Sequence, residues 1–283
     1  RLSGGQRPAV RATTERMELD DYRIREDVKV KLGAFKPDDD GGLSRDIAEA
    51  ELPNLLARML DLQERLFAER RRSLLIVLQG RDAAGKDGTI KHVVGGFNPL
   101  GINVVAFKAP NELERAHDFL WRVHHHVPAA GHVAIFNRSH YEDILVPSVQ
   151  KLLPPSVVDP RHDHIRGFER TLVDAGTCVL KFFLHISKSE QRERLQERLD
   201  NPDKHWKFDP KDLDARAAWD QYTDVYEKIF ERTSTKDAPW YVVPADRKWF
   251  RNYLVARVIV RALERMSLQY PEAPPGLAGT KIP

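Results

Sequence analysis

The chain has a single cysteine among its 283 residues, which excludes a disulfide within the chain. Cys178 begins the apolar run 178–180, so we expect a buried packing thiol in a reducing compartment. The sequence also lacks an apolar stretch of the roughly 18 residues that a membrane-spanning helix requires. Residues 1–6 are polar and lack the apolar segment of a signal peptide. These absences predict a cytoplasmic protein with no membrane partner.

An excess of one charge is absent as well, since 45 lysine and arginine residues stand against 42 aspartate and glutamate residues. Basic and acidic residues interleave and form no one-signed stripe, which argues against a nucleic-acid partner. Any preference for anions must therefore be local. The length and a hydrophobic content of 41% suit one large core, and we predict one main domain over residues 43–270.

Alternating strand and helix patterns predict an α/β fold with a central parallel sheet that helices cover on both faces. The expected strands are 74–78, 102–107, 132–136, 178–186 and 240–243. The expected helices are 44–70, 112–127, 162–175, 213–233 and 249–266. The main domain is flanked by a charged N-terminal arm, 1–42, and a C-terminal tail, 271–283. We expect the arm to be extended or to wrap the domain in part.

A glycine-rich loop at 80–88 follows the apolar strand 74–78 and leads into a helix. Glycines let successive backbone N–H groups turn toward one anion, and Lys86 can reach the terminal phosphates of a bound ligand. The alternative is a purely structural glycine turn. The remaining candidate phosphate-binding residues of the loop are Gly80, Ala83, Ala84, Gly85, Asp87 and Gly88.

Two carboxylates in this loop predict a divalent cation. Asp87 occupies the position after the lysine, where a serine or threonine usually binds magnesium, and Asp82 lies inside the loop. Asp82 would repel a polyanion unless a cation such as magnesium, or manganese in its place, lay between them. The alternative is that either aspartate only caps the following helix.

A second polar segment, 137–143, directly follows the buried strand 132–136. An apolar strand that ends in acids and an arginine is typical of the second metal-binding element beside a phosphate loop. We expect Asp143 to hold magnesium and Arg138 to clamp a phosphate with its planar donors. The alternative is a capped helix start with a surface ion pair.

The segment 187–212 is predicted to form a lid. Arg194 and Arg198 lie four residues apart on a charged helix, and Lys204 and Lys207 follow it. Such a basic segment can fold over phosphates and exclude water. The alternative is an ordinary solvated helix, because glutamates at 190, 193 and 197 can pair with these arginines.

Taken together, these motifs resemble the second family of polyphosphate kinases, from about residue 52 to residue 266. The segments that carry the likeness are 80–88, 137–143, Arg194 with Arg198, 201–207 and 238–241. The resemblance implies a P-loop kinase-like fold of three α/β/α layers with a helical lid, and commonly a homo-oligomer. It also implies reversible phosphoryl transfer between inorganic polyphosphate and AMP, ADP or ATP.

By this resemblance Asp82 and Asp143 position magnesium and the acceptor phosphate, Lys86 and Arg138 bind phosphates, and the two arginines come from the lid. Family members that phosphorylate only diphosphates typically read Asp-Arg-Ser-Trp-Tyr-Asn in the second motif. This chain has asparagine first and Glu142 last, which resembles the subclass that accepts both mono- and diphosphates. An acid at 142 can bridge through magnesium to a monophosphate.

Two other functions are compatible with a phosphate-binding loop. One is an ATP-dependent nucleoside monophosphate kinase, and the other is a nucleotide-binding regulator without transfer activity. A basic channel long enough for a polymer distinguishes the polyphosphate enzyme from the monophosphate kinase, whereas Asp82 argues against the regulator, because a pure phosphate binder gains nothing from an acid beside its ligand. Its candidate lining residues are Lys91, Lys108, Arg122, Lys204 and Lys207.

Overall fold

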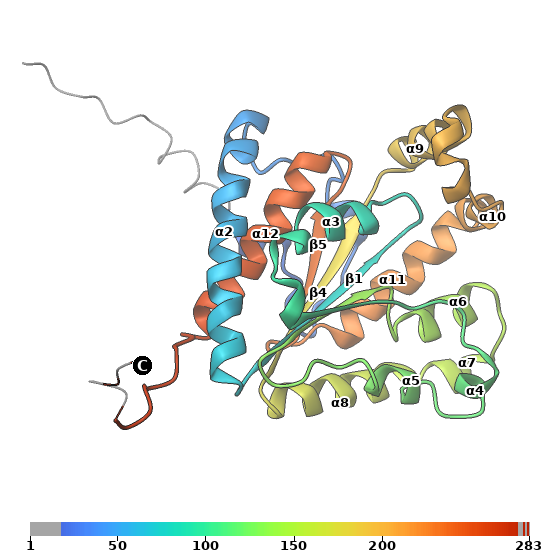
Figure 1. Ribbon diagram of the computed structural model, residues 1–283. Helices are drawn as coiled ribbons and strands as arrows, with labels where there is room; N and C mark the ends of the chain where they lie inside the picture. Colours follow the sequence, from blue (N-terminus) through green and yellow to red (C-terminus); the bar gives the residue numbers. More distant parts are fainter. Residues whose placement is uncertain (1–17, 277–279, 281, 283) are drawn as a thin grey trace, which may run out of the picture.

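Five parallel strands form the central sheet of the computed structural model, which describes residues 18–276, 280 and 282 (Figure 1). Across the sheet the order is β2-β3-β1-β4-β5. The strands are β1 (Ser73–Gly80), β2 (Ile102–Ala106), β3 (Val133–Asn137), β4 (Thr177–His185) and β5 (Trp240–Pro244). Each matches a predicted strand, and the predicted α/β fold class is confirmed. Since β1 and β3 are neighbours, their carboxyl ends bring the two polar segments of the sequence to one edge.

The central strand β1 is buried along its whole length, as a strand covered on both faces should be. Its side chains alternate between two hydrophobic clusters because successive residues point to opposite faces. Leu74, Ile76 and Leu78 belong to one cluster, whereas Leu75 and Val77 belong to the other. The phosphate loop therefore starts from a rigid strand.

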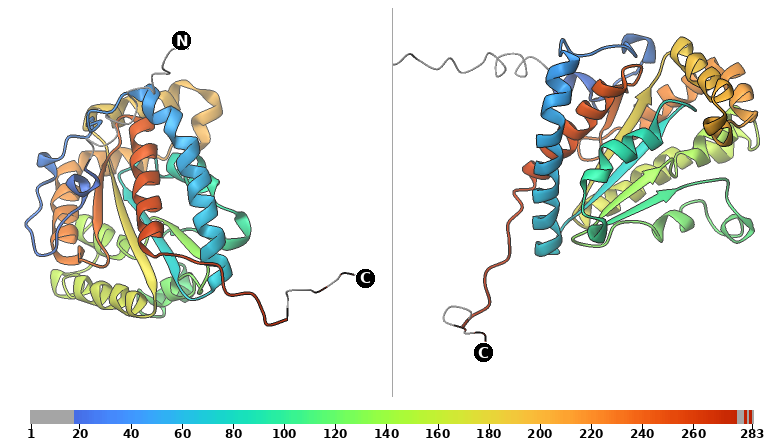
Figure 2. Two further views of the ribbon diagram at one scale, coloured as in Figure 1. Left: turned by 90° about the vertical axis from the view of Figure 1, so that its left-hand side faces the viewer. Right: turned by 45° about the horizontal axis from the view of Figure 1, so that its top comes forward.

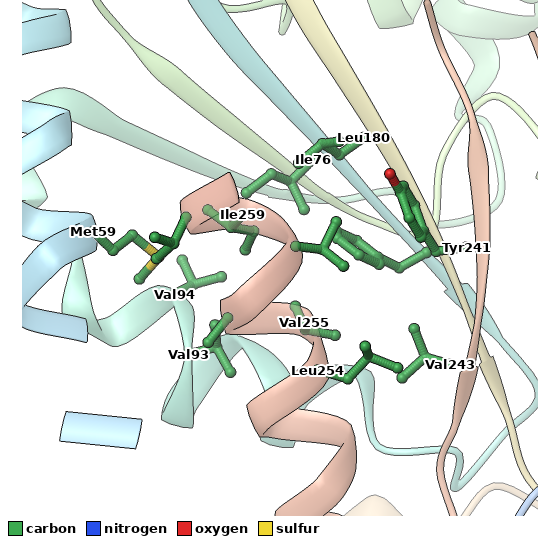
Figure 3. Packing of buried hydrophobic residues seen from close by; sticks show 14 of the residues in the cluster. Met59, Ile76, Val93, Val94, Leu180, Tyr241, Val243, Leu254, Val255 and Ile259 are labelled. Carbon is green, nitrogen blue, oxygen red and sulfur yellow. The ribbon is translucent and has the colours of Figure 1, made fainter. Parts of the chain in front are cut away.

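Helices α2 (Arg45–Glu69), α3 (Lys86–His92) and α12 (Lys248–Arg265) cover one face of the sheet, where α2 and α12 lie side by side (Figure 2). Met59 of α2, Ile259 of α12 and Ile76 of β1 meet in this layer (Figure 3). The other face carries α6 (Glu142–Val149), α8 (Arg161–Asp174) and α11 (Trp219–Thr233). Shorter elements are α4 (Glu112–Arg115), α5 (Trp121–His124) and α7 (Pro155–Val158), and 3-10 turns at Leu19–Tyr22, Leu32–Ala34, Val94–Gly96 and Pro99–Gly101.

Two predicted helices are interrupted. The helix expected at 112–127 is divided into α4 and α5, because the Asp118 side chain accepts a hydrogen bond from the Leu120 N–H and forms a local turn. The helix expected at 213–233 is divided at Ala218, where the backbone leaves helical geometry at ψ 25°. This second break separates α10 (Lys211–Ala217) from α11.

Residues 18–43 form a strap along the open edge of the sheet beside β5 and α11 (Figure 2). Arg23 makes an antiparallel bridge to Tyr241, and the Leu32 N–H donates to Glu227 Oε1 at 2.8 Å. The apolar side chains of the strap, Leu19, Tyr22, Ile24, Val30, Leu32 and Leu43, are buried. The described part of the predicted arm thus wraps the domain, while residues 1–17 lie outside the described residues.

Helices α9 (Lys188–Asp200) and α10, with a 3-10 turn at Pro202–Lys207 between them, project beyond the carboxyl edge of the sheet (Figure 1). We call residues 188–217 the lid. Every helix in the described part of the chain is too short or too polar to cross a bilayer.

Candidate active site

The loop 80–88 joins β1 to α3 through left-handed backbone at Ala83 (φ 62°) and Gly85 (φ 105°). Gly85 needs its lack of a side chain, since a Cβ there would lie 1.9 Å from Nη1 of Arg251. A non-glycine residue would also be strained at this φ. Gly80 closes the end of β1 against β4, and Ala84 is fully buried. The loop therefore has a fixed curvature.

Lys86 opens α3 with its ammonium group on the loop itself. Its Nζ donates to the carbonyl oxygens of Gly80 at 2.7 Å and Arg81 at 3.2 Å. Burial lowers the pKa of Lys86, and the charge of Arg138 lowers it further. The lysine is thus desolvated and held at the loop by two carbonyl groups that a phosphate oxygen can replace.

Asp82 and Arg138 bring the ends of β1 and β3 together, because Arg138 Nη2 donates to Asp82 Oδ1 at 2.7 Å. Arg138 adopts left-handed backbone (φ 60°), and its N–H donates to the Leu78 carbonyl at 3.0 Å. Beside this pair, Asn137 Nδ2 donates to Asp87 Oδ1 at 2.8 Å. Strained non-glycine backbone of this kind is concentrated at functional sites.

A cleft of about 1510 Å³ lies over the loop, bounded by α2, the start of α12 and the lid. Twelve lysines and arginines line it against seven aspartates and glutamates, so the cleft is more basic than the chain as a whole. A polyanion is the ligand that this excess attracts. The predicted site residues that line it are Asp82, Ala83, Gly85, Lys86, Asp87, Gly88, Arg138, Arg194, Arg198, Lys204 and Lys207.

Asp143 lies outside this cleft lining. Its Oδ2 accepts a hydrogen bond from Arg122 at 3.0 Å, and its carbonyl accepts one from Arg161 at 2.5 Å. The ion pair lies at the start of α6, but it is largely buried and so differs from the surface pair of the alternative, and a magnesium role for Asp143 stays a prediction. Arg122, a predicted channel residue, is buried and also bonded to the Lys108 carbonyl, so it does not line the cleft either. Lys91 and Lys108 do line it.

Glu142 begins α6 and is not a cleft-lining residue. Burial raises the pKa of its carboxyl group, although the charges of Arg138 and Lys86 act in the opposite direction. The same two cations therefore connect Glu142 to the loop electrostatically.

The two lid arginines have different surroundings. Arg194 is buried and donates hydrogen bonds to backbone carbonyls. Its Nη1 donates to the Ala83 carbonyl at 3.0 Å, and its Nη2 donates to the Ala245 carbonyl at 2.7 Å. Arg198 Nη1 donates to Asp212 Oδ2 at 3.1 Å. The pairing expected for a solvated helix also occurs, because Arg194 Nε donates to Glu190 at 2.7 Å.

Two cleft residues have no counterpart in the sequence-based prediction. Asp212 of α10 has a pKa raised to about 6, first by burial and then by the charge of Asp82. Arg251 of α12 lies against Gly85 and Gly88, and burial lowers its pKa to about 10. A signal existed only for Arg251, which is a charged residue within the apolar pattern of α12.

Comparison with known proteins identifies the family of the chain. The family model described as Polyphosphate kinase 2 (PPK2) matches residues 42–271. The chain belongs to the polyphosphate kinase 2 family. The predicted family is thereby confirmed, and the match includes the loop 80–88, the segment 137–143 and the lid.

Relatives in this family match nearly the whole chain. The AMP/ADP-polyphosphate phosphotransferase of Meiothermus ruber is 51% identical over 265 residues, covering 92% of this chain and 98% of that protein. The ADP-polyphosphate phosphotransferase of Rhodopseudomonas palustris is 41% identical over 267 residues, covering 90% and 92%. The crystal structure of Polyphosphate Kinase 2 from Arthrobacter aurescens TC1 has a TM-score of 0.86 at 43% identity, over 88% of this chain and 90% of that one. The P-loop kinase-like fold is confirmed.

Below the second motif of this polyphosphate kinase 2 domain lies a buried ion-pair network. Lys181 Nζ donates to Glu169 Oε2 at 2.6 Å, to the Tyr141 hydroxyl at 3.1 Å and to the Thr233 carbonyl at 2.7 Å. The Tyr141 hydroxyl donates to Glu169 at 2.7 Å, and His140 Nε2 lies 3.3 Å from the same carboxylate. The network fixes the turn that presents the second motif to the loop.

Proposed function

We propose that this chain transfers a phosphoryl group reversibly between inorganic polyphosphate and nucleoside mono- and diphosphates, converting AMP to ADP and ADP to ATP. The observation that carries the proposal is that Lys86 and the Asp82–Arg138 pair line a basic cleft of about 1510 Å³. The name of the Meiothermus ruber relative, which includes both AMP and ADP, supports the two acceptors.

Phosphoryl transfer depends on alignment and charge neutralisation more than on covalent catalysis. Lys86 and Arg138 would neutralise the transferring group from the loop side, while Arg198, Lys204 and Lys207 would do so from the lid side. The polymer would lie along the remaining basic wall of the cleft. The reaction is then a direct in-line transfer with no covalent enzyme intermediate.

The residues present fit magnesium, with manganese as an alternative. Magnesium is usually held by one or two carboxylates together with substrate phosphates. Among the described residues no three His, Cys, Asp or Glu side chains gather as a complete metal cage, so the phosphates would supply the other ligands. Asp82 is the predicted metal-binding carboxylate that lines the cleft, whereas Asp143 is held by Arg122. When bound, the cation would reduce the repulsion between Asp82 and the phosphates.

The test is an assay with the purified chain, magnesium, long-chain polyphosphate and either AMP or ADP, with all triphosphates omitted. We expect ATP from both acceptors, separated and quantified by chromatography. Product from ADP alone would keep the polyphosphate donor but reject the monophosphate acceptor. A chain that is inactive with polyphosphate but phosphorylates AMP when ATP is supplied would instead be a nucleoside monophosphate kinase.

Replacing Glu142 with glutamine is expected to lower kcat/KM for AMP about 10- to 100-fold more than for ADP. The reason is that a charged group bridging to the monophosphate contributes about 1.5–3 kcal/mol. Glu142→Gln keeps the shape of the side chain, and Glu264→Gln on the outside of α12 is the matched control. Equal loss with both acceptors would show that Glu142 does not select the monophosphate.

Asp212 predicts a specific pH dependence. Below its pKa of about 6 the carboxyl group is protonated and no longer a charged partner for Arg198. We expect Asp212→Asn to lower kcat/KM about fivefold at pH 8, as the loss of about 1 kcal/mol would do. The ratio of wild-type to variant activity should approach one as the pH falls through about 6, and titration of the substrate cancels in this ratio. A ratio constant with pH would contradict the prediction.

The ionisation of Asp212 also makes the free energy of unfolding depend on pH. Its pKa in the folded chain is raised above the ordinary 3.8, so the folded state binds the proton more tightly than the unfolded state. The free energy of unfolding therefore decreases as the pH rises from about 4 through about 6, and Asp212→Asn lacks this decrease.

Self-association and a cytoplasmic location stay predictions. Size-exclusion chromatography with light scattering tests the first, and cell fractionation tests the second.

A further inference from the structure

The side chain of Arg81 connects the phosphate loop to the end of the lid. Its guanidinium carbon lies 3.8 Å from the centre of the Trp219 ring, and Nη2 donates to the Trp219 carbonyl at 3.0 Å and to Thr223 Oγ1 at 2.5 Å. Arg81 is 8% exposed and is not a cleft-lining residue, unlike its neighbour Asp82. Cation–π contacts are strongest at desolvated positions of this kind.

Trp219 begins α11 immediately after the break at Ala218, the point where the chain returns from the lid to the body of the domain. Arg81 therefore holds the returning end of the lid. Lys188, at the first residue of the lid, reaches the same ring, with its Nζ 5.8 Å from the ring centre. The Trp219 ring, at the returning end of the lid, is thus within cation–π range of the first lid residue and of Arg81 in the loop.

The entering end of the lid is bonded to the next two loop residues. Gln191 Nε2 donates to the Asp82 carbonyl at 3.0 Å, and Arg194 Nη1 donates to the Ala83 carbonyl at 3.0 Å. Arg216, in the last turn of α10, donates to Gln191 Oε1 at 3.0 Å and so joins the two ends. Three successive loop residues are in this way fixed to the two points where the lid is attached.

Burial of Arg81 is unfavourable on electrostatic grounds. It forms no ion pair with a carboxylate in the described part of the chain, and burial lowers its pKa to about 10. A guanidinium group held mainly by a ring face and a carbonyl is specified by geometry, because lysine has neither the planar face nor the forked donors. A role in positioning accounts for this cost better than stability does.

We propose that Arg81 and Trp219 form a latch that sets the orientation of the lid together with the curvature of the phosphate loop. Both are positioning residues, because they act through Asp82, Ala83 and the lid cations rather than by contact with the substrate. The latch rests on the proposed function for its effect on turnover, but its effect on the lid is a property of the protein alone. Movement of the lid would then change the curvature of the phosphate loop, and a change in the loop would move the lid.

The experiment compares the full chain with Arg81→Met, Trp219→Leu and the double variant. We measure kcat and KM for ADP with polyphosphate, hydrogen exchange of peptides from residues 188–217, and the melting temperature. We expect kcat to fall about 10- to 100-fold, as misplacement of catalytic groups by about 1 Å does. Lid peptides should exchange faster while β1 and β4 peptides stay protected. The double variant should be no worse than the more damaged single variant, because the two residues act as one unit.

Two conservative changes and one control sharpen the result. Trp219→Phe keeps a ring face and should retain kcat within a few-fold, whereas Arg81→Lys should behave like Arg81→Met. Arg232→Met removes an exposed ion pair on α11 and should change none of the readouts. Unchanged lid exchange in Arg81→Met, or exchange that rises equally in β1 and β4, would overturn the latch. If the wild-type chain fails to use polyphosphate, the exchange measurements still decide the proposal.

Discussion

Replacing Lys86 with alanine is expected to lower kcat for polyphosphate-driven phosphorylation by about 10²–10³-fold, the usual effect of removing one preorganised charged donor. The ammonium group is partly buried in the cleft, where a charge acts more strongly than in water. Among the described residues its hydrogen-bond partners are the carbonyls of Gly80 and Arg81, both of which belong to the same loop. The measurement is steady-state kinetics with ADP and polyphosphate.

The fold should survive this change, because in the described part of the chain the Lys86 side chain donates hydrogen bonds to its own loop and to no other element. We expect the circular dichroism spectrum to be unchanged and the melting temperature to shift by a few degrees at most. Lys228→Ala is the matched control, since that lysine pairs with Asp159 on the surface away from the cleft. Near-normal turnover in Lys86→Ala would reject the loop as the site of transfer.

The strands, their parallel arrangement and the phosphate loop could be predicted because each is written in a short stretch of sequence. Residues 74–88 contain an apolar strand, a glycine-rich loop and the lysine in order. Helix α8 was likewise predicted within one residue of its observed bounds at each end. Local patterns of this kind are independent of the rest of the chain.

The side-chain partners could not be predicted, because they depend on residues distant in sequence. Arg251 meets Gly85 only after α12 packs beside α3, and no spacing rule connects them. Asp143 is predicted to hold magnesium together with Asp82, and no sequence pattern indicated that Arg122, on a different element, would donate to its carboxylate. The direction in which a carboxylate points depends on which cation lies near it in the fold.

The strap shows the same limit for charged segments. Residues 18–43 contain too many charges for a periodic pattern, so the apolar side chains among them gave no helix or strand signal. They are buried nevertheless, because each reaches the domain singly while its charged neighbours pair with distant groups such as Glu227. Apolar residues that are buried without a helical or strand period give no local sequence pattern from which their burial can be predicted.

Replacing Lys181 with methionine is expected to lower the free energy of unfolding by about 3–5 kcal/mol, because it leaves the buried carboxylate of Glu169 without its cation. Both side chains are nearly inaccessible to solvent. Burial alone would raise the pKa of Glu169, but the charge of Lys181 and the hydrogen bond with His140 hold it below its ordinary value. Urea denaturation followed by fluorescence measures the loss, and Lys228→Met should change stability by less than about 1 kcal/mol.

The pH dependence of this loss identifies its cause. Without Lys181, burial should raise the pKa of Glu169 above its value in the unfolded chain, so that stability decreases as the pH rises between those two values. The deficit of Lys181→Met relative to wild type should therefore be larger at about pH 8 than at about pH 5. Adding Glu169→Leu removes the orphaned charge and should restore part of the stability, since both partners are then replaced by apolar groups. A deficit equal at both pH values, with no recovery in the double variant, would mean that lost packing and not the unpaired carboxylate weakens the fold beneath the second motif.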